Sequence, residues 1–221
     1  MKHTRLFLSG GLFAFIMIGN AAAQQGENLL KFSDFEDAKV DLLQKPAANW
    51  GSRFYVHKKD SEEQQTKMQA LTSRKISTDN PASGTRCAAL ITPLTVNQFR
   101  DEKGKPEISN RISQNIIVPE STEPVQYKLT FKLRSKMENC PGLNSFRVFV
   151  TCLDNTQQSK GKQLGKMKEV GLPSKPDWQE HSISFVAPAG ARLLIVSLAL
   201  YGCGEAYIDD IELRQDQAKQ P

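Results

Sequence analysis

Two adjacent carboxylates, Asp209 and Asp210, lie between Ile208 and Ile211 near the end of a chain of 221 residues. The segment 205–214, EAYIDDIELR, is otherwise rich in apolar residues and is typical of a β-strand with a buried face. Burying a carboxylate is costly unless a partner compensates its charge. The doublet therefore requires a cation, a β-bulge that turns a carboxylate outward, or both.

No catalytic motif accompanies this doublet. The sequence contains no HExxH, no GxSxG and no Gly-rich phosphate-binding loop. Neighbouring residues on a strand point to opposite faces, so Asp209 and Asp210 cannot flank a glycosidic bond as an acid pair. His57 and His181 are expected to be surface or strand residues rather than bases. We predict that the protein is not an enzyme.

The first 23 residues are expected to be a signal peptide. Lys2 and Arg5 precede a short apolar run over 6–18, and Ala21 to Ala23 supply small residues for cleavage. The run is too short to span a bilayer, and no second long apolar stretch follows. We therefore expect an exported protein, periplasmic or secreted, without membrane insertion.

Cysteine content and charge narrow the possible ligands. An exported chain with an even number of cysteines favours disulfides, and the four are Cys87, Cys140, Cys152 and Cys203. A zinc site is not expected, because no CxxC pair is present. The formal net charge is +5, but the lysines are spread through polar loops such as 160–168 with few aromatic residues among them. This pattern favours solvated loops over a nucleic-acid-binding patch.

The elements that position these residues are predicted to be strands. Alternation in 125–134 places Tyr127, Leu129, Phe131 and Leu133 on one buried face. Residues 37–73 are expected to form a long excursion that can include a short helix, 154–177 a polar loop, and 215–221 a disordered tail. The pattern indicates one all-β domain over 24–214, a β-sandwich. The expected strands are 28–36, 75–78, 86–91, 111–118, 125–134, 145–153, 178–186, 191–201 and 205–214.

Four segments, in their order along the chain, resemble motifs of carbohydrate-binding modules of families 4, 9 and 22. They are NLLKFSDFE, YKLTFKLRS, WQEHSISFVAP and YIDDIEL. The resemblance implies a jelly-roll β-sandwich of two antiparallel sheets, within the galactose-binding-like group. The chain departs from the pattern at Ser33-Asp34, where the family usually has a glycine. The implied function is glycan binding, and the alternative is a structural or protein-interaction sandwich of the cell envelope without sugar binding.

The resemblance also implies a structural calcium ion where the first and last strands meet. Its matching positions are Glu36 and Asp209, with Asp34 as a further candidate ligand. Calcium binds carboxylate and carbonyl oxygens. The alternative is a β-bulge alone, with one carboxylate in solvent and the other capping a nearby loop.

The jelly-roll wiring implied by the family predicts two disulfides. Strand 125–134 would run antiparallel to 205–214, which brings Cys140 beside Cys203. Cys87 and Cys152 would then bridge the two sheets at the opposite end.

A glycan-binding patch is expected on the outer face of one sheet. If Cys152 points inward, strand alternation turns Arg147 and Phe149 outward, together with Tyr201 on the neighbouring strand. Gln114 lies on a third strand, and its side is ambiguous. The predicted patch comprises Gln114, Arg147, Phe149 and Tyr201. Trp50 and Trp178 are expected in the core rather than in this patch.

Overall fold

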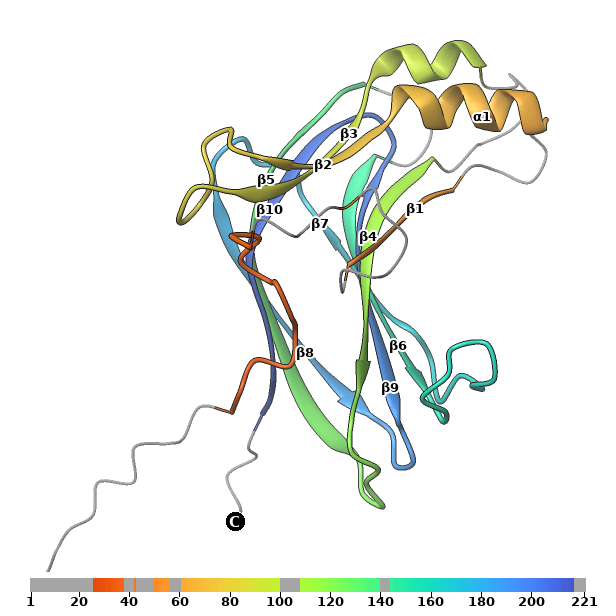
Figure 1. Ribbon diagram of the computed structural model, residues 1–221, viewed down its shortest axis with the longest axis vertical. Helices are drawn as coiled ribbons and strands as arrows, with labels where there is room; N and C mark the ends of the chain where they lie inside the picture. Colours follow the sequence, from red (N-terminus) through yellow and green to blue (C-terminus); the bar gives the residue numbers. More distant parts are fainter. Residues whose placement is uncertain are drawn as a thin grey trace, which may run out of the picture.

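A computed structural model describes residues 26–37, 42, 50–55, 61–99, 108–139 and 144–216. Two antiparallel sheets, each of five strands, face each other across a shared core (Figure 1). The predicted all-β jelly-roll sandwich is therefore confirmed. The predicted signal peptide and the end of the tail lie outside the described residues.

The strand order defines two sheets with different neighbours. Sheet A has the order β1 (Gly51–Tyr55), β4 (Ser109–Ile117), β9 (Leu193–Tyr201), β6 (Ser145–Leu153) and β7 (Lys168–Leu172). Sheet B has the order β2 (Ser73–Ser77), β3 (Cys87–Thr92), β10 (Gly204–Gln215), β5 (Val125–Met137) and β8 (Gln179–Ala187).

The core lies between the sheets and follows the predicted alternation. Leu129, Phe131 and Leu133 of β5 meet Phe146 and Val148 of β6, and all five side chains are buried. Because β-strand side chains alternate between faces, the odd-numbered residues of β6 must then lie on the outer face of sheet A.

Two helical segments cover one end of the sandwich (Figure 1). Helix α1 (Glu62–Leu71) begins at a capping box in which Ser61 and Gln64 satisfy each other's backbone N–H groups. A 3-10 helix, η1 (Leu94–Phe99), packs against it through a small cluster of Met68, Val96 and Ile108. Neither described helix has the length and apolar character needed to cross a membrane.

The segment 28–36 is not a strand, which corrects the prediction. Phe32 and Phe35 have φ angles of 50° and 58°, in the left-handed region that extended chains avoid. The segment still runs beside the last strand, as the family resemblance implies. The Leu29 N–H donates to the Leu213 carbonyl at 2.8 Å, and the Ile211 N–H donates to the Ser33 carbonyl at 3.0 Å.

Two edge strands, β1 and β7, lie in segments that were expected to be loops. Their sequences, GSRFY and KEVGL, carry glycine and charge and show little alternation. Each pairs with only one neighbour, so each needs little apolar surface.

The two tryptophans differ in position, since Trp50 lies in the core and Trp178 lies on the surface. Trp50 is 1% exposed and its ring N–H donates to the Lys31 carbonyl at 3.1 Å, so its expected core position is confirmed. Trp178 is half-buried on the outer face of sheet B, where its ring N–H donates to the Asn80 carbonyl. The expectation of a core Trp178 is wrong, because it precedes β8 and packs beside Tyr207 outside the sandwich.

The predicted Cys87–Cys152 disulfide is also wrong. Cys152 belongs to the core between the sheets, whereas Cys87 clusters with Ala89 and Tyr207 on the outer face of sheet B. The sheet itself separates these two buried free thiols.

The Cys140–Cys203 disulfide stays a prediction, because Cys140 lies outside the described residues. The strand pairing on which it rests is confirmed: β5 runs antiparallel to β10, and the Glu138 N–H donates to the Cys203 carbonyl at 3.0 Å.

Candidate functional site

Asp209 lies at a β-bulge in β10 and is fully buried. The register of β10 against β5 shifts between Asp209 and Glu212, and Asp210 has a φ of 48°. One Asp209 oxygen, Oδ2, accepts the backbone N–H groups of Ala82 at 2.9 Å and Ser83 at 3.1 Å. Burial raises the pKa of Asp209, although these N–H groups and that of Asp210 act in the opposite direction.

Ala82 and Ser83 begin the loop 82–86, and Glu36 binds the end of this loop. Its carboxylate accepts the N–H groups of Thr85 at 2.9 Å and Arg86 at 2.8 Å, and the Thr85 hydroxyl at 2.8 Å. The backbone N–H of Thr85 is the largest cause that lowers the pKa of Glu36. Gly84, with a φ of 56°, allows this approach, because a Cβ there would collide with the Glu36 carboxylate. We call Glu36, Asp209 and the loop 82–86 the acid clasp.

The acid clasp does not fit the calcium site that the family resemblance implies. Its two carboxylates are turned toward N–H donors of the loop rather than toward a common ion. Asp34, the third predicted ligand, is exposed and accepts the Glu36 N–H at 3.2 Å. No group of three or more His, Cys, Asp or Glu among the described residues could hold a metal ion. The arrangement instead matches the alternative, a bulge whose buried carboxylate caps a loop.

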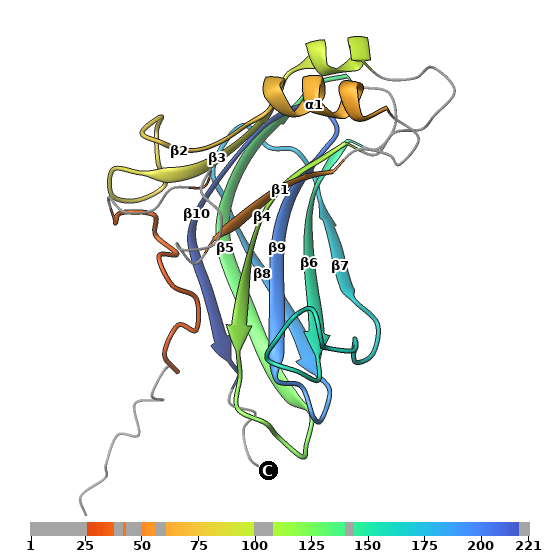
Figure 2. The same cartoon turned by 45° about the vertical axis from the view of Figure 1, so that its right-hand side comes forward.

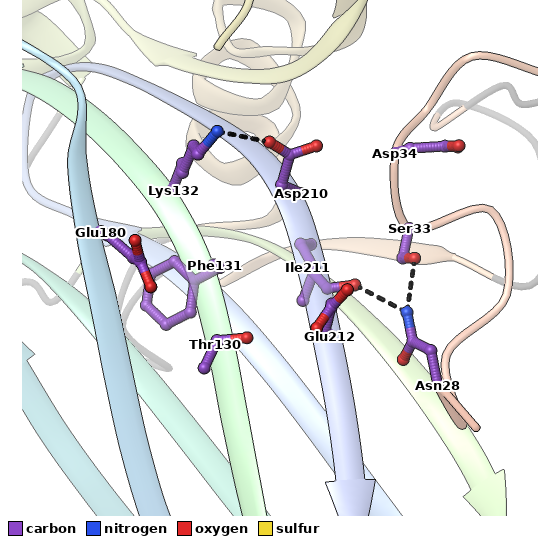
Figure 3. A pocket seen from close by; sticks show the side chains of 10 residues that line it. All are labelled: Asn28, Ser33, Asp34, Thr130, Phe131, Lys132, Glu180, Asp210, Ile211 and Glu212. Carbon is purple, nitrogen blue, oxygen red and sulfur yellow. Dashed lines mark hydrogen bonds and ion pairs between the residues drawn. The ribbon is translucent and has the colours of Figure 1, made fainter. Parts of the chain in front are cut away.

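A pocket of about 440 Å³ adjoins the bulge (Figure 3). The Lys132 ammonium pairs with the Asp210 carboxylate at 2.8 Å. Opposite them, the Asn28 amide donates to the Ser33 hydroxyl at 3.0 Å and to the Ile211 carbonyl at 3.1 Å. These contacts attach the N-terminal segment to β10, so we assign the pocket a structural role.

A second hollow, a groove of about 490 Å³, lies on the outer face of sheet A. Its floor consists of outward side chains of β4, β9 and β6, among them Ser113, Ser197 and Phe149. Gln158 and Gln163 of the loop after β6 also line the groove. Figure 2 shows that this loop curls back beside β6. A bridge between Leu153 and Gln163 holds this loop against β6.

The structure brings together three of the four predicted patch residues. The rings of Phe149 and Tyr201 lie 5.8 Å apart, and the Arg147 guanidinium lies 5.4 Å from the Tyr201 ring centroid. Both aromatic residues are largely buried, with exposed fractions of 7% and 8%. Arg111 covers the Phe149 ring at 5.5 Å and donates to the Tyr201 hydroxyl at 3.2 Å.

Gln114 does not belong to this patch. It is 4% exposed and pairs with inward-facing Val196. Its amide exchanges two hydrogen bonds with the Lys31 backbone, at 2.9 Å and 3.0 Å, so it holds the N-terminal segment instead.

Arg53 and Arg111 line the groove and were missed in the sequence. The signal for Arg111 was present, because Ile112 and Ile116 are apolar and alternation turns their odd-numbered neighbours outward. Arg53 gave no such signal, since it lies on the edge strand β1.

Comparisons with known proteins support the fold. No family model matches the sequence, and no match was found among curated proteins. Among solved structures, the chain is similar to the enzymatically active domain of tailspike protein 4 of bacteriophage CBA120, with a TM-score of 0.56 and 12% identity. That match covers 86% of this chain and 21% of the tailspike chain, so the chain spans about a fifth of it.

Other similar structures are named for carbohydrate binding. A protein from Bacteroides thetaiotaomicron, named for a proposed sugar-binding role, has a TM-score of 0.51 and 12% identity, over 86% of this chain and 100% of that one. A xylan-binding family 22 module from Paenibacillus barcinonensis has a TM-score of 0.45 and 11% identity, over 89% and 99%. Modules of families 4 and 61 are also similar. The jelly-roll fold that the predicted resemblance implies is confirmed by the two antiparallel sheets and by the matches with TM-scores of 0.56 and 0.51, and at these identities the likeness concerns the fold alone.

Proposed function

We propose that the protein is an exported, non-catalytic, carbohydrate-binding-module-like protein that binds a glycan in the groove of sheet A. The observation that carries this proposal is the groove itself. It combines hydroxyl and amide side chains, such as Ser113, Ser197 and Gln163, with an aromatic floor at Phe149. Hydroxyls and amides are the groups that bond sugar hydroxyls. Since fold alone does not define a ligand, the site has to be tested directly.

One observation favours the alternative, a structural or protein-interaction sandwich. The aromatic faces that would stack on a neutral sugar are covered by Arg111 and Arg147. A conventional stacking platform is therefore not offered by Phe149 and Tyr201.

A pair of matched tryptophan substitutions distinguishes these readings. Thr151 is half-buried on β6 and lines the groove, whereas Thr130 is half-buried on β5 of the opposite sheet. We expect Thr151→Trp to fill the groove and abolish retention in glycan affinity gels, and Thr130→Trp to leave retention unchanged. Thermal unfolding of both variants controls for folding. Unchanged binding by Thr151→Trp, or wild-type protein that no glycan retains, would contradict the proposal.

A further inference from the structure

Three arginines form one row across the outer face of sheet A. In the strand register, Arg53 of β1 lies opposite Arg111 of β4, and Arg111 lies opposite Ala199 of β9. Ala199 in turn lies opposite Arg147 of β6. Directly opposed residues project from the same face of a sheet. Ala199 separates Arg111 from Arg147 and is buried in a small cluster with Phe149 and Tyr201, so these two rings occupy the middle of the row.

Aromatic rings orient two of these guanidinium groups. Arg111 lies 5.5 Å from the Phe149 ring centroid, and Arg147 lies 5.4 Å from that of Tyr201. A guanidinium that stacks on a ring keeps its planar set of N–H donors in a fixed orientation. The rings therefore support cations and do not present open faces to sugar C–H groups.

The groove is positively charged in its immediate surroundings. Arg53 and Arg111 line it, and none of the described residues that line it is Asp or Glu. At the edge of the sheet, Arg147 pairs with Glu169. Because Arg53 and Arg111 lie opposite each other, both guanidinium groups can donate to one anion bound between them.

We infer that the groove selects an acidic glycan, whose sugar units carry carboxylate or sulfate groups; this inference rests on the proposed function. The planar donor pair of a guanidinium matches a carboxylate or sulfate in a way that a neutral hydroxyl does not. Ser113, Ser197 and Gln163 supply the neutral contacts to sugar hydroxyls beside this row.

The test compares ligands that differ only in charge. Polygalacturonate and its fully methyl-esterified form share one backbone, and the ester removes the negative charge. We expect the wild-type protein to bind polygalacturonate at least about tenfold more tightly, because a single charge-assisted hydrogen bond contributes that much or more. Chondroitin sulfate, set against chemically desulfated chondroitin, shows whether sulfate or carboxylate is preferred.

Substitutions locate the charge effect. Arg53→Gln and Arg111→Gln should each weaken polygalacturonate binding about tenfold while leaving any residual binding of the ester unchanged. Lys75→Gln removes the same charge from an exposed position on sheet B and is the matched control, with an expected change below about twofold. Because Arg53 is exposed, its variant keeps the inference testable even if Arg111→Gln fails to fold.

Three outcomes would overturn the inference, and they differ in what they say about the groove. Equal binding of polygalacturonate and its ester, lost in Thr151→Trp, would refute the acidic preference and keep the glycan site. If Lys75→Gln weakened polygalacturonate binding as much as the arginine substitutions do, the net charge of the chain would explain the preference and the groove would not. Absence of binding to every acidic and neutral glycan would refute the proposed function as well.

Discussion

The acid clasp predicts that Asp209 contributes more to stability than its neighbour Asp210. Asp209→Ala removes the acceptor of three backbone N–H groups, those of Ala82, Ser83 and Asp210. An unsatisfied buried donor costs about 1–3 kcal/mol. Ser83 is exposed, so water can replace one of the three lost bonds. We therefore expect a loss of about 2–4 kcal/mol in the free energy of unfolding, somewhat less than two full penalties.

Two asparagine substitutions serve as graded controls. Asp209→Asn keeps one oxygen that can accept both loop N–H groups and removes the buried charge, but its NH2 group cannot accept the Asp210 N–H. We therefore expect a loss of only about 1 kcal/mol. Asp210→Asn weakens a half-exposed ion pair with Lys132, and asparagine tolerates its left-handed backbone, so we expect about 0–1 kcal/mol.

Equilibrium unfolding in urea, followed by tryptophan fluorescence and circular dichroism, measures these differences. In a domain of this size each kcal/mol shifts Tm by about 2–4 °C, so Asp209→Ala should melt about 4–16 °C lower. A loss below about 1 kcal/mol for Asp209→Ala, or one no larger than that of Asp210→Asn, would refute the clasp.

The pKa of Asp209 adds a dependence on pH with a defined sign. Burial raises this pKa above the ordinary value of 3.8, so the folded state keeps the proton to higher pH than the unfolded state. The contribution of Asp209 is therefore complete below 3.8 and declines as the pH rises through the raised folded-state pKa. The difference between wild type and Asp209→Ala should accordingly be larger near pH 4 than near pH 7.

Two further predictions concern the cysteines and calcium. Burial raises the pKa of the Cys87 thiol to about 12, so iodoacetamide should label neither Cys87 nor Cys152 in the native protein at about pH 8. Both should react after unfolding without reductant. A disulfide-linked Cys87–Cys152 peptide in non-reducing peptide mapping would contradict their placement on opposite faces of sheet B. Adding calcium or EDTA should shift Tm by less than about 1 °C, since the clasp oxygens accept N–H groups; a calcium-dependent rise of several degrees would restore the predicted ion.

Much of the fold could be predicted because strand alternation records which face is buried. Strand β6 has the bounds expected for 145–153, and its inward residues Phe146, Val148 and Val150 all lie in the core. The same reasoning wrongly predicted a strand over 28–36, because the apolar residues of this segment anchor an irregular chain to the core. Phe35 packs against Trp50 with ring centroids 5.9 Å apart, a contact that no periodicity in 28–36 reveals.

The candidate site was predictable only in part, for a reason that lies in strand register. The outward position of Phe149 and Tyr201 follows from alternation within their own strands. Which residue lies opposite which depends on pairing between strands far apart in the sequence. Arg53 and Arg111 become neighbours only through the β1–β4 register, and that pairing spans 58 positions of the chain.

This register also changes the functional role that we assign to the aromatic residues. Without their neighbours, Phe149 and Tyr201 predict a platform on which neutral sugars stack. Placed beside Arg111 and Arg147, the same rings have their faces occupied and instead orient cations. Because guanidinium donors cover the ring faces in this groove, we expect its affinity to be higher for an anionic glycan than for a neutral one. The comparison of polygalacturonate with its methyl ester therefore tests the chemistry that the register creates, independently of the fold that the chain shares with carbohydrate-binding modules.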